Sequence, residues 1–424
     1  MGVFSATAIV IGSMVGTGVF TTTGFLIRDV NSNPAVLAVW VLGGVVALCG
    51  ALAYAELVAA LPDNGGEYQL LSRIYHPGVG FVAGFVSLIV GFSAPVAAAA
   101  IAFGEYLSRV IPGIPPLTAA LLLVALTSMA HVARVSLGVG ILGWTTLLHV
   151  LLILGVVVGG LPLGKLAYLT PPAQRPFAEA MLSPQLAVGL IYVSFAYSGW
   201  NAAAYVAGEV REPQRTVPRA LLLGTASVIV LYLALNLVFL MAAPPARLSG
   251  VVEVGHVAAL SLFGPGAARV ASAIVTVGLF TTVVALVMTG PRVYERMGQD
   301  YPALRLLASR TGKRGPGPAT LLQAALASIM IVTSSFDDLL TYMGFTLSLF
   351  AALTVCGVFV LRIREPELRR PYRTWGHPAT TVLALALMVW MIVHSLTQRT
   401  VTSLVGLSTL AAGAGCYLAI RRRR

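Results

Sequence analysis

Two short segments hold the residues best suited to binding a small molecule, and both interrupt stretches that are otherwise apolar. The first, Gly12 to Gly18 (GSMVGTG), contains three glycines and two hydroxyl side chains. The second, Phe195 to Asn201 (FAYSGWN), places a glycine and several polar groups in a similar setting. Glycine destabilises a helix by about 1 kcal/mol relative to alanine, so each segment predicts a helix interruption. For the first segment taken alone, close packing between helices is an equally good explanation.

An interrupted helix exposes backbone groups that can bind an ionic ligand. A helix that restarts after Gly16 offers free N–H groups and a partial positive charge, which suits a carboxylate. The carbonyl groups that end the first half of the second interrupted helix suit an ammonium group. Unwound backbone inside a membrane is tolerated where it lines a cavity. Together the two segments predict one site with both poles, which fits a zwitterion such as an amino acid.

The composition of the chain indicates that these segments lie in a membrane. Of the 424 residues, 58% are apolar and 10% are charged, whereas an average soluble domain has about 25% charged residues. The charges gather in clusters between apolar runs, and about 20 apolar residues are enough to span the hydrocarbon core. The sequence therefore predicts an all-α polytopic membrane protein. It excludes a soluble enzyme, a nucleic-acid-binding protein and a disordered protein.

The apolar runs predict twelve transmembrane helices, the first and sixth of which contain the two interruptions. A further stretch, 251–264, predicts a short helix within a loop. The twelve predicted helices cover residues 4–27, 35–61, 79–110, 117–137, 139–163, 183–207, 218–243, 267–290, 318–335, 338–361, 378–396 and 401–420.

The basic residues predict the orientation of the chain in the membrane. Of the 27 Lys and Arg residues, 20 fall in loops after even-numbered helices or at the C-terminus, and cytoplasmic loops collect positive charge. Both termini are therefore expected in the cytoplasm, with the multi-pass chain in the plasma membrane (the inner membrane of a bacterium). The cysteines Cys49, Cys356 and Cys416 match no metal or disulfide spacing, and the sequence predicts no cofactor and no bound metal.

The positions of the interruptions suggest an internal repeat. Each interrupted helix is the first of five, so residues 1–163 form one predicted half and residues 183–363 the other. Residues 376–424 add two peripheral helices and a cytoplasmic arginine tail. Paired interruptions at corresponding positions are typical of transporters built from inverted repeats.

At this point the motifs resemble a known group of proteins, the amino acid–polyamine–organocation (APC) superfamily. The similar segments are GSMVGTGVF, YAELVAALPDNGGEYQLL, FAYSGWNAAAYVAGEVREPQRTVPRA, TGPRV and RRPYRTWGHP, in chain order. The FAYSGWN segment is closest to the L-type amino acid transporter branch and its bacterial relatives. The resemblance implies a LeuT-type fold, with ten core helices in a 5+5 inverted repeat and two peripheral helices. It also implies alternating access around a site in the middle of the membrane.

The same resemblance implies which residues contact the substrate. The Thr17 side chain and the N–H groups of Gly16 and Gly18 would hold the carboxylate, with Ser13 at the polar position just before them. Phe195 would be an aromatic lid between the pocket and the exterior. The residues that it places at the site are Ser13, Met14, Gly16, Thr17, Gly18, Phe195, Ala196, Ser198 and Asn201.

The ammonium group of the substrate would be held by backbone carbonyls. The resemblance assigns this role to the carbonyls of Met14, Phe195 and Ser198, and it makes Asn201 a polar residue of the pocket wall. Neither interrupted segment contains a carboxylate that could hold a second ammonium. This favours substrates with neutral side chains over polyamines or other organic cations.

One predicted helix carries a residue that could couple transport to protons. His149 occupies the position in the fifth helix that is often lysine in the family, where it would reach the first interruption and Thr282 in the eighth helix. Histidine has an unperturbed pKa of about 6.5, so we hypothesise that its protonation shifts the hinge between outward- and inward-facing states. A neutral imidazole bonded to a backbone carbonyl is the alternative, and transport would then be obligate exchange.

Together these features predict a secondary active transporter of amino acids, and not an enzyme, driven by proton coupling or by amino acid exchange. The alternatives are a polyamine or organic-cation carrier of the same fold and an amino acid sensor that does not transport. The predicted partners are the substrate, the lipid bilayer and possible coupling protons, with no nucleic acid and no evident partner subunit. Glu56 and Glu209 are expected to form ion pairs that brace the cytoplasmic gate.

Overall fold

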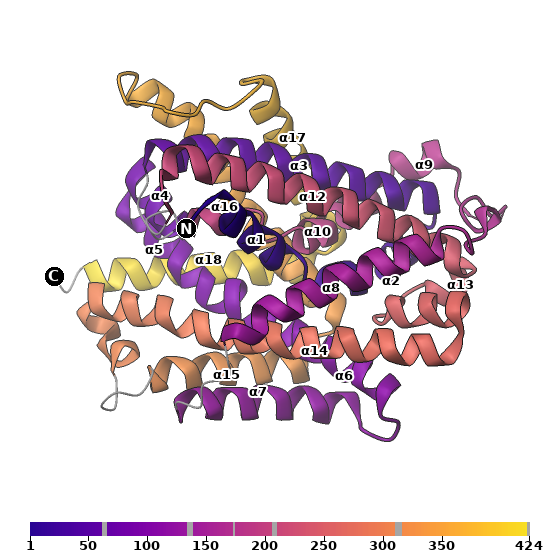
Figure 1. The fold of residues 1–424 in the computed structure, drawn as a ribbon. Coiled ribbons are helices and arrows are strands. Elements are labelled where there is room, and N and C mark those ends of the chain that lie inside the picture. Colours follow the sequence, from indigo (N-terminus) through magenta and orange to yellow (C-terminus); the bar gives the residue numbers. More distant parts are fainter. Residues whose placement is uncertain (62–65, 134–138, 173, 206–209, 310–315, 422–424) are drawn as a thin grey trace.

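The computed structural model describes residues 1–61, 66–133, 139–172, 174–205, 210–309 and 316–421, and these residues form helices with no strand among them. The long helices run roughly alongside one another, and the two ends of the chain lie at the same end of the bundle (Figure 1). We call this the terminal end. The short helices α9 (Phe177–Met181) and α13 (Pro245–Leu248) lie at the opposite end, the loop end.

The first half of the chain supplies the first interrupted helix and the elements that follow it. These elements are α1 (Val3–Met14), α2 (Thr17–Val30), α3 (Asn33–Ala60), α4 (Gly66–Ile74), α5 (Pro77–Val86), the π-helical η1 (Ser87–Ser93), α6 (Ala94–Val110), α7 (Pro116–Val132), α8 (Val139–Gly160) and the 3₁₀ turn η2 (Leu166–Tyr168).

The second half begins with α9 and the second interrupted helix. Its remaining elements are α10 (Pro184–Ala196), α11 (Ala202–Tyr205), α12 (Pro213–Ala242), α13, α14 (Val254–Asp300), the 3₁₀ segment η4 (Pro302–Ala308), α15 (Gly317–Thr333), α16 (Phe336–Arg364), α17 (Ala379–Gln398) and α18 (Thr400–Arg421).

In the described part of the chain, eight helical segments are long and apolar enough to cross a membrane, among them Val3–Val30 and Pro77–Val110. Four shorter apolar helices, α7, the Trp144–Gly160 part of α8, α10 and α15, lie at the other positions where the sequence predicts spans. Gly264, with φ of 83°, separates residues 254–263 from the rest of α14. This separate segment corresponds to the short loop helix that the sequence predicts.

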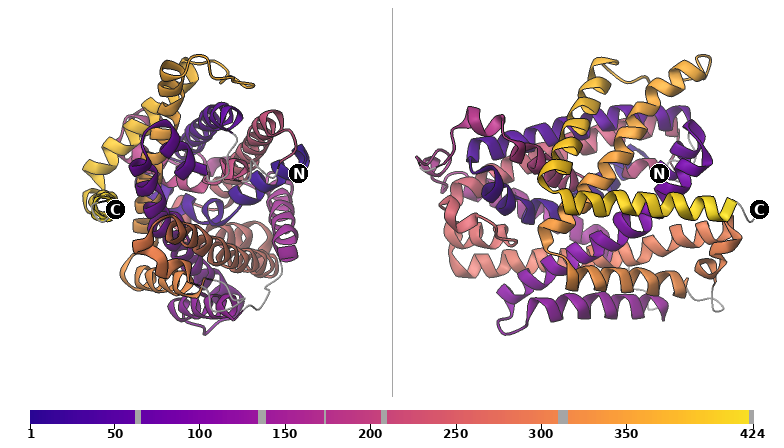
Figure 2. Two further views of the ribbon diagram at one scale, coloured as in Figure 1. Left: turned by 90° about the vertical axis from the view of Figure 1, so that its left-hand side faces the viewer. Right: turned by 180° about the vertical axis from the view of Figure 1, so that it is seen from behind.

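The halves α2 and α10 of the interrupted helices lie in the interior of the bundle, whereas Ala6, Val10 and Met14 are the buried residues of α1. Helix α12 packs along α3 and α1, and α14 packs along α6 and α8. Residues Thr17 to Ile27 of α2 are all buried, as are Leu186 to Val193 of α10. Helices α17 and α18 lie on the outside and bury less of their surface (Figure 2). The fold therefore covers α2 and α10 with other helices and leaves Ser13, near the end of α1, exposed.

Candidate binding site at two interrupted helices

The first interruption lies between α1 and α2. Helix α1 ends at Met14, and Gly16 adopts φ of −144° and ψ of −144° before α2 begins at Thr17. A Cβ placed on Gly16 would meet no atom closer than the Met14 carbonyl oxygen, at 4.0 Å. Open space therefore lies beside the Gly16 Cα, next to the N-terminus of α2, and the N–H groups of a helix N-terminus can bind an anion.

The second interruption separates α10 from the four-residue helix α11. The Ser198 N–H donates to the Phe195 carbonyl at 2.9 Å, and Gly199 has φ of 97°. This conformation is in the left-handed region, where glycine has no steric penalty. The helix therefore stops in a tight turn instead of continuing through the bundle.

The two interruptions lie directly against each other. A Cβ on Gly18 would lie 2.4 Å from the Ala196 Cα, and a Cβ on Gly199 would lie 2.5 Å from the Ser13 carbonyl oxygen. Close packing thus explains Gly18 and Gly199. It does not explain Gly16, which faces open space. In the first segment, close packing therefore accounts for Gly18, whereas Gly16 lies at the interruption of the helix.

A tyrosine that the sequence analysis did not select contacts the first interruption. The Tyr232 hydroxyl, fully buried in α12, donates to the Met14 carbonyl at 2.5 Å, and the Gly16 N–H donates to the oxygen of the same hydroxyl. The Tyr232 ring packs against Tyr197 and Trp40, with centroid distances of 5.3 and 5.7 Å. A lone tyrosine within an apolar span, one helical turn before Asn236, was the only signal in the sequence.

Solvent accessibility divides the predicted site residues. Ser13 is exposed, whereas Phe195, Ser198 and Asn201 are partly buried. Thr17 is 7% exposed, and its carbonyl accepts from the Thr21 hydroxyl at 2.9 Å. The accessible groups therefore belong to α1 and to the turn after α10, while those at the start of α2 are covered.

Asn201 has a carboxylate neighbour that was not selected from the sequence. The Asn201 Nδ2 atom donates to Glu67 Oε1 at 3.3 Å, and the Tyr54 hydroxyl donates to the same oxygen at 2.5 Å. Trp200 packs edge-on against Tyr54, with 4.7 Å between ring centroids. Glu67 lies in the GGEY part of a motif quoted above, but nothing in its spacing indicated that it reaches the second interruption.

His149 lies in α8 against the loop-end half of the first interrupted helix and against α14. Its ring is 5.7 Å from the Phe20 ring, and a Cβ on Gly278 would collide with it at 1.5 Å. The side chain is 6% exposed, and its Nε2 has no hydrogen-bond partner in the described part of the chain. The Thr282 hydroxyl donates to the Gly278 carbonyl, so the predicted coupling residue Thr282 lies one helical turn after the glycine that the His149 ring contacts.

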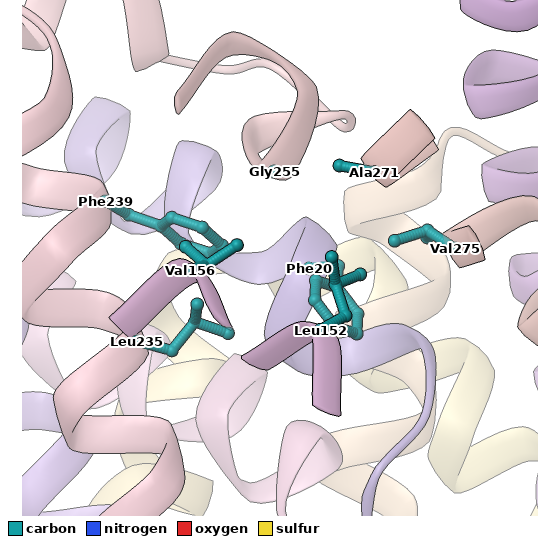
Figure 3. Close-up of a pocket in the computed structure, with 8 residues that line it drawn as sticks. All are labelled: Phe20, Leu152, Val156, Leu235, Phe239, Gly255, Ala271 and Val275. Carbon is teal, nitrogen blue, oxygen red and sulfur yellow. The ribbon is translucent and has the colours of Figure 1, made fainter. Parts of the chain in front are cut away.

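A small apolar cavity lies on the loop-end side of the interruptions (Figure 3). Its volume of about 10 Å³ is near the lower limit for one water molecule. This cavity is too small for an amino acid and offers no polar side chain. Its lining residues are Phe20, Leu152, Val156, Leu235, Phe239, Gly255, Ala271 and Val275.

At the loop end, charged residues join the two interrupted helices to α16. Arg28 contacts Asp29 at 2.7 Å and Asp337 at 2.8 Å, and Arg399 contacts the same two carboxylates at 3.0 and 3.4 Å. Arg399 also donates to the Tyr192 hydroxyl of α10 at 2.7 Å. We call these five residues the loop-end cluster. It links α2, α10, α16 and the connection between α17 and α18.

At the terminal end, Glu56 of α3 is 1% exposed and forms an ion pair with Arg362 at 2.7 Å. Arg370 lies 3.6 Å from the Glu56 carboxylate, and the Thr374 N–H donates to it at 2.7 Å. We call these four residues the Glu56 cluster. The ion pair predicted for Glu56 is present and joins α3 to α16 and the loop after it. Glu209 lies outside the described residues.

Comparison with known proteins shows similarity over almost the whole chain. The amino acid permease family model matches residues 1–412. The Rattus norvegicus protein named large neutral amino acids transporter small subunit 2 is 28% identical over 431 residues, which cover 98% of this chain and 80% of that protein.

Two further relatives come from a mammal and a bacterium. The b(0,+)-type amino acid transporter 1 of Mus musculus is 26% identical over 389 residues, covering 88% of this chain and 78% of the relative. The serine/threonine exchanger SteT of Bacillus subtilis (strain 168) is 27% identical over 435 residues, covering 100% and 97%. These proteins agree with the branch that the sequence motifs resemble.

Proposed function

The chain belongs to the amino acid permease family, and from that premise we propose that it moves amino acids with neutral side chains across a membrane by alternating access. It is an amino acid transporter and not an enzyme, because 98–100% of its own length is similar to proteins that are by name transporters and exchangers. The polarity of the side chain, the binding residues and the energy source are the proposed parts of this function.

We propose twelve membrane spans arranged as two inverted halves, residues 1–163 and 183–363, followed by the peripheral residues 376–424. Eight long and four shorter apolar helices at the predicted positions support this arrangement. Both termini lie at one end of the bundle, and the excess of basic residues in the loops of that side supports its location in the cytoplasm.

One observation carries the proposed site: the open space in front of Gly16, directly beside the second interruption. The N–H groups of Gly16 and Gly18 and the hydroxyl of Thr17 are the proposed carboxylate ligands, with Ser13 beside them. This arrangement uses the partial positive charge at the N-terminus of α2.

The carbonyls of Met14, Phe195 and Ser198 are the proposed ammonium ligands. The Met14 carbonyl already accepts from Tyr232, and the Phe195 carbonyl from Ser198. A carbonyl oxygen has two lone pairs, so each can accept a second hydrogen bond from the substrate. Ala196 forms the floor where the two interruptions touch, and Asn201 is a wall residue.

The position of Glu67 supports a second candidate function, the transport of organic cations. Its carboxylate lies next to Asn201 and could face a second ammonium group. However, its Oε1 atom already accepts hydrogen bonds from Tyr54 and Asn201, so much of its hydrogen-bonding capacity is used within the protein. This favours neutral side chains.

The energy source is proposed to be a proton gradient acting through His149 and Thr282, or else the exchange of one amino acid for another. The rat relative is by its name a small subunit, so a partner subunit is a further arrangement to test. The bacterial relative, which is similar over its full length, is by its name an exchanger. We propose that this chain transports without a partner.

The function is tested with the purified chain alone in proteoliposomes. Vesicles loaded with serine or leucine should take up the labelled amino acid several times faster than empty vesicles, and saturably. Free amino acids should compete, whereas their methyl esters and putrescine should not, because the proposed site needs a carboxylate. Equal competition by the esters would contradict the carboxylate pole, and competition by putrescine alone would favour the cation carrier.

The site is tested at Gly16. Gly16→Leu should leave the protein folded, since the Cβ meets no close neighbour, but should abolish substrate binding by covering the N–H groups. Gly2→Leu is the matched control, because Gly2 also has no neighbour within 4 Å and lies outside the proposed site. Binding at wild-type affinity in the folded Gly16→Leu protein would refute the site.

A further inference from the structure

Glu67 connects α4 to two elements that α4 otherwise touches little, α3 and the turn after α10. It lies at the start of α4, which packs against α5 and α16. Its Oε1 atom accepts from the Tyr54 hydroxyl of α3 at 2.5 Å and from the Asn201 amide of the second interruption at 3.3 Å. One carboxylate oxygen thus joins α4 to α3 and to the turn that carries the proposed pocket wall.

The turn after α10 is held on α3 by a second contact beside this one. The Trp200 ring lies edge-on to Tyr54 at an interplanar angle of 77°, and a Cβ on Gly50 would lie 2.8 Å from the Trp200 ring. Tyr54 therefore contacts both Trp200 and Glu67. The position of Asn201 depends on this group of side chains, which we call the Glu67 group: Gly50, Tyr54, Glu67, Trp200 and Asn201.

The orientation of the Asn201 amide follows from the charge of its partner. A carboxylate accepts hydrogen bonds and donates none, so the amide nitrogen must face Glu67 and the Oδ1 oxygen is directed away from it. Two residues before Asn201, Gly199 lies against the Ser13 carbonyl. A shift of Asn201 would therefore be transmitted to both interruptions.

Building on the proposed function, we propose that Glu67 is a positioning residue of the substrate site. In its charged form it holds Asn201 and the turn after α10 in the arrangement that binds substrate. Its protonation weakens the bond to Asn201 and releases the turn. Glu67 acts through Asn201 and does not itself touch the substrate.

The surroundings of Glu67 leave its carboxylate without a cationic partner among the described residues. Of the groups on neighbouring elements, Glu56 of α3 is paired with Arg362, and His76 at the start of α5 accepts from Gly78 N–H. Other titratable or charged groups on these neighbouring elements include Tyr68, Arg73, Arg364 and Glu365. Arg73 and Glu365 pair with each other, and Arg364 binds the Ile74 carbonyl at the far end of α4.

The sign of the pH effect follows from these surroundings. Burial raises the pKa of Glu67, while the hydrogen bond from Tyr54 favours the charged form and lowers it in part. As the pH falls, Glu67 should therefore take up a proton before an ordinary glutamate would, and substrate affinity should fall with it. Tyr54→Phe removes the hydrogen bond and should move this transition to higher pH.

The experiment measures two properties of wild type, Glu67→Gln, Glu67→Asp and Tyr54→Phe between pH 5 and 8. The first is the apparent KM and maximal rate of serine exchange in proteoliposomes. The second is the alkylation rate of a Ser198→Cys reporter in detergent, in a chain whose three native cysteines are replaced by serine. The alkylation assay needs no transport and reports directly on the turn after α10.

For wild type we expect KM and alkylation to rise together as the pH falls. Glu67→Gln should show, at every pH, the low-pH values of wild type, with KM raised about tenfold and the maximal rate within twofold. Glu67→Asp retains the charge and should restore the pH dependence. A Glu67→Gln protein with the KM and alkylation profile of wild type would overturn the proposal.

The two proposals fail in different ways in this experiment. If wild-type vesicles exchange no amino acid, the proposed function is wrong, and the alkylation profile alone then decides whether Glu67 holds the turn. If wild-type vesicles exchange amino acids normally and the Glu67 variants behave like wild type, the positioning role of Glu67 is wrong and the proposed transport function is retained. Variants are compared only when their size-exclusion profiles match that of wild type.

Discussion

The loop-end cluster and the Glu56 cluster both contain paired arginines and carboxylates, but they join different kinds of helix. In the loop-end cluster, the charged side chains are between 14% and 39% exposed, and they connect the halves α2 and α10 of the interrupted helices to α16. In the Glu56 cluster, the carboxylate is 1% exposed, and it connects α3 to α16 and the following loop. No residue of an interrupted helix takes part in it.

The exposure of the two clusters decides how easily each can separate. Exposed ion pairs typically contribute about 0–1 kcal/mol each, whereas removing one partner of a buried pair typically costs about 3–5 kcal/mol. The pairs that are easily separated therefore span the interrupted helices, and the costly ones join continuous helices. A transporter that opens alternately at its two ends needs this division, because the contacts that break and re-form during the cycle must be weak.

The terminal-end halves α1 and α11 extend the same comparison. Neither contains a charged residue. The contacts described near them include the packing of α1 along α12, the Tyr232 bond to Met14 and the contacts of the Glu67 group. Hydrogen bonds of this kind contribute about 1 kcal/mol each. The interrupted helices are thus held by partly exposed ion pairs at one end, and by uncharged hydrogen bonds and helix packing at the other.

The largest effect expected from this comparison is at Glu56. Glu56→Gln leaves Arg362 and the 7% exposed Arg370 facing a neutral amide, and it should lower the free energy of unfolding by about 3 kcal/mol. Glu365→Gln is the matched control, because its pair with Arg73 lies at the same end but is 32% and 51% exposed. It should change stability by less than about 1 kcal/mol.

Both variants are measured by denaturant unfolding in the same detergent, followed by circular dichroism. Equal effects of Glu56→Gln and Glu365→Gln would remove the distinction between buried and exposed clusters on which the comparison rests. Transport by the surviving folded fraction of Glu56→Gln should retain its wild-type KM, because this cluster contains no residue of the proposed site.

Much of the fold could be predicted because its signals are local in the sequence. Apolar runs gave the positions of the helices, and glycine-rich segments gave the two interruptions between Met14 and Thr17 and between Ala196 and Ala202. The helix ends differ by several residues, since hydropathy does not register caps and turns. For the same reason, the sequence could not distinguish Gly18, which is needed for packing, from Gly16, which faces open space.

The parts of the site that could not be predicted depend on contacts between distant residues. Tyr232 reaches Met14 across 218 positions, and Asn201 reaches Glu67 across 134. A tyrosine in an apolar span and a glutamate in a polar loop are both ordinary by themselves. The interrupted segments contain no carboxylate, but the fold places Glu67 of α4 next to the second one. Only the arrangement of helices shows this.

A smaller effect is expected when the loop-end cluster is weakened. Asp337→Asn removes a carboxylate from Arg28 and Arg399, and it should lower stability by about 1 kcal/mol because both arginines are partly exposed. The loss should shrink in 1 M salt, where the screening length is about 3 Å. Asp338→Asn is the control, since Asp338 accepts from Ser335 and has no arginine partner in the described part of the chain.

The outcome at Asp337 tests the other half of the comparison. A loss as large as that of Glu56→Gln, or one that does not respond to salt, would mean that the loop end is held as firmly as the buried cluster. Alternating access would then need a different weak contact at this end. A small, salt-sensitive loss in Asp337→Asn but not in Asp338→Asn would support the division between weak and strong clusters.

The smallest effect is expected at His149, where only the shape of a pH profile should change. The ring lies between Phe20 of α2 and Gly278 of α14, so it contacts the loop-end half of the first interrupted helix, opposite the half that Glu67 influences. We expect the maximal uptake rate to vary with pH over the range in which this buried imidazole takes up a proton, without a sodium requirement. His149→Gln should flatten this profile and leave KM at pH 7.5 unchanged, whereas Glu67→Gln should alter KM. His149→Lys should shift the profile towards that of a permanently charged side chain.

Initial rates are measured against pH, with and without sodium, for all four proteins. If His149→Gln keeps the wild-type pH profile, the His149 ring contributes only to packing. Transport would then be amino acid exchange without a coupling ion, and substrate binding alone would have to open and close the contacts of the two clusters.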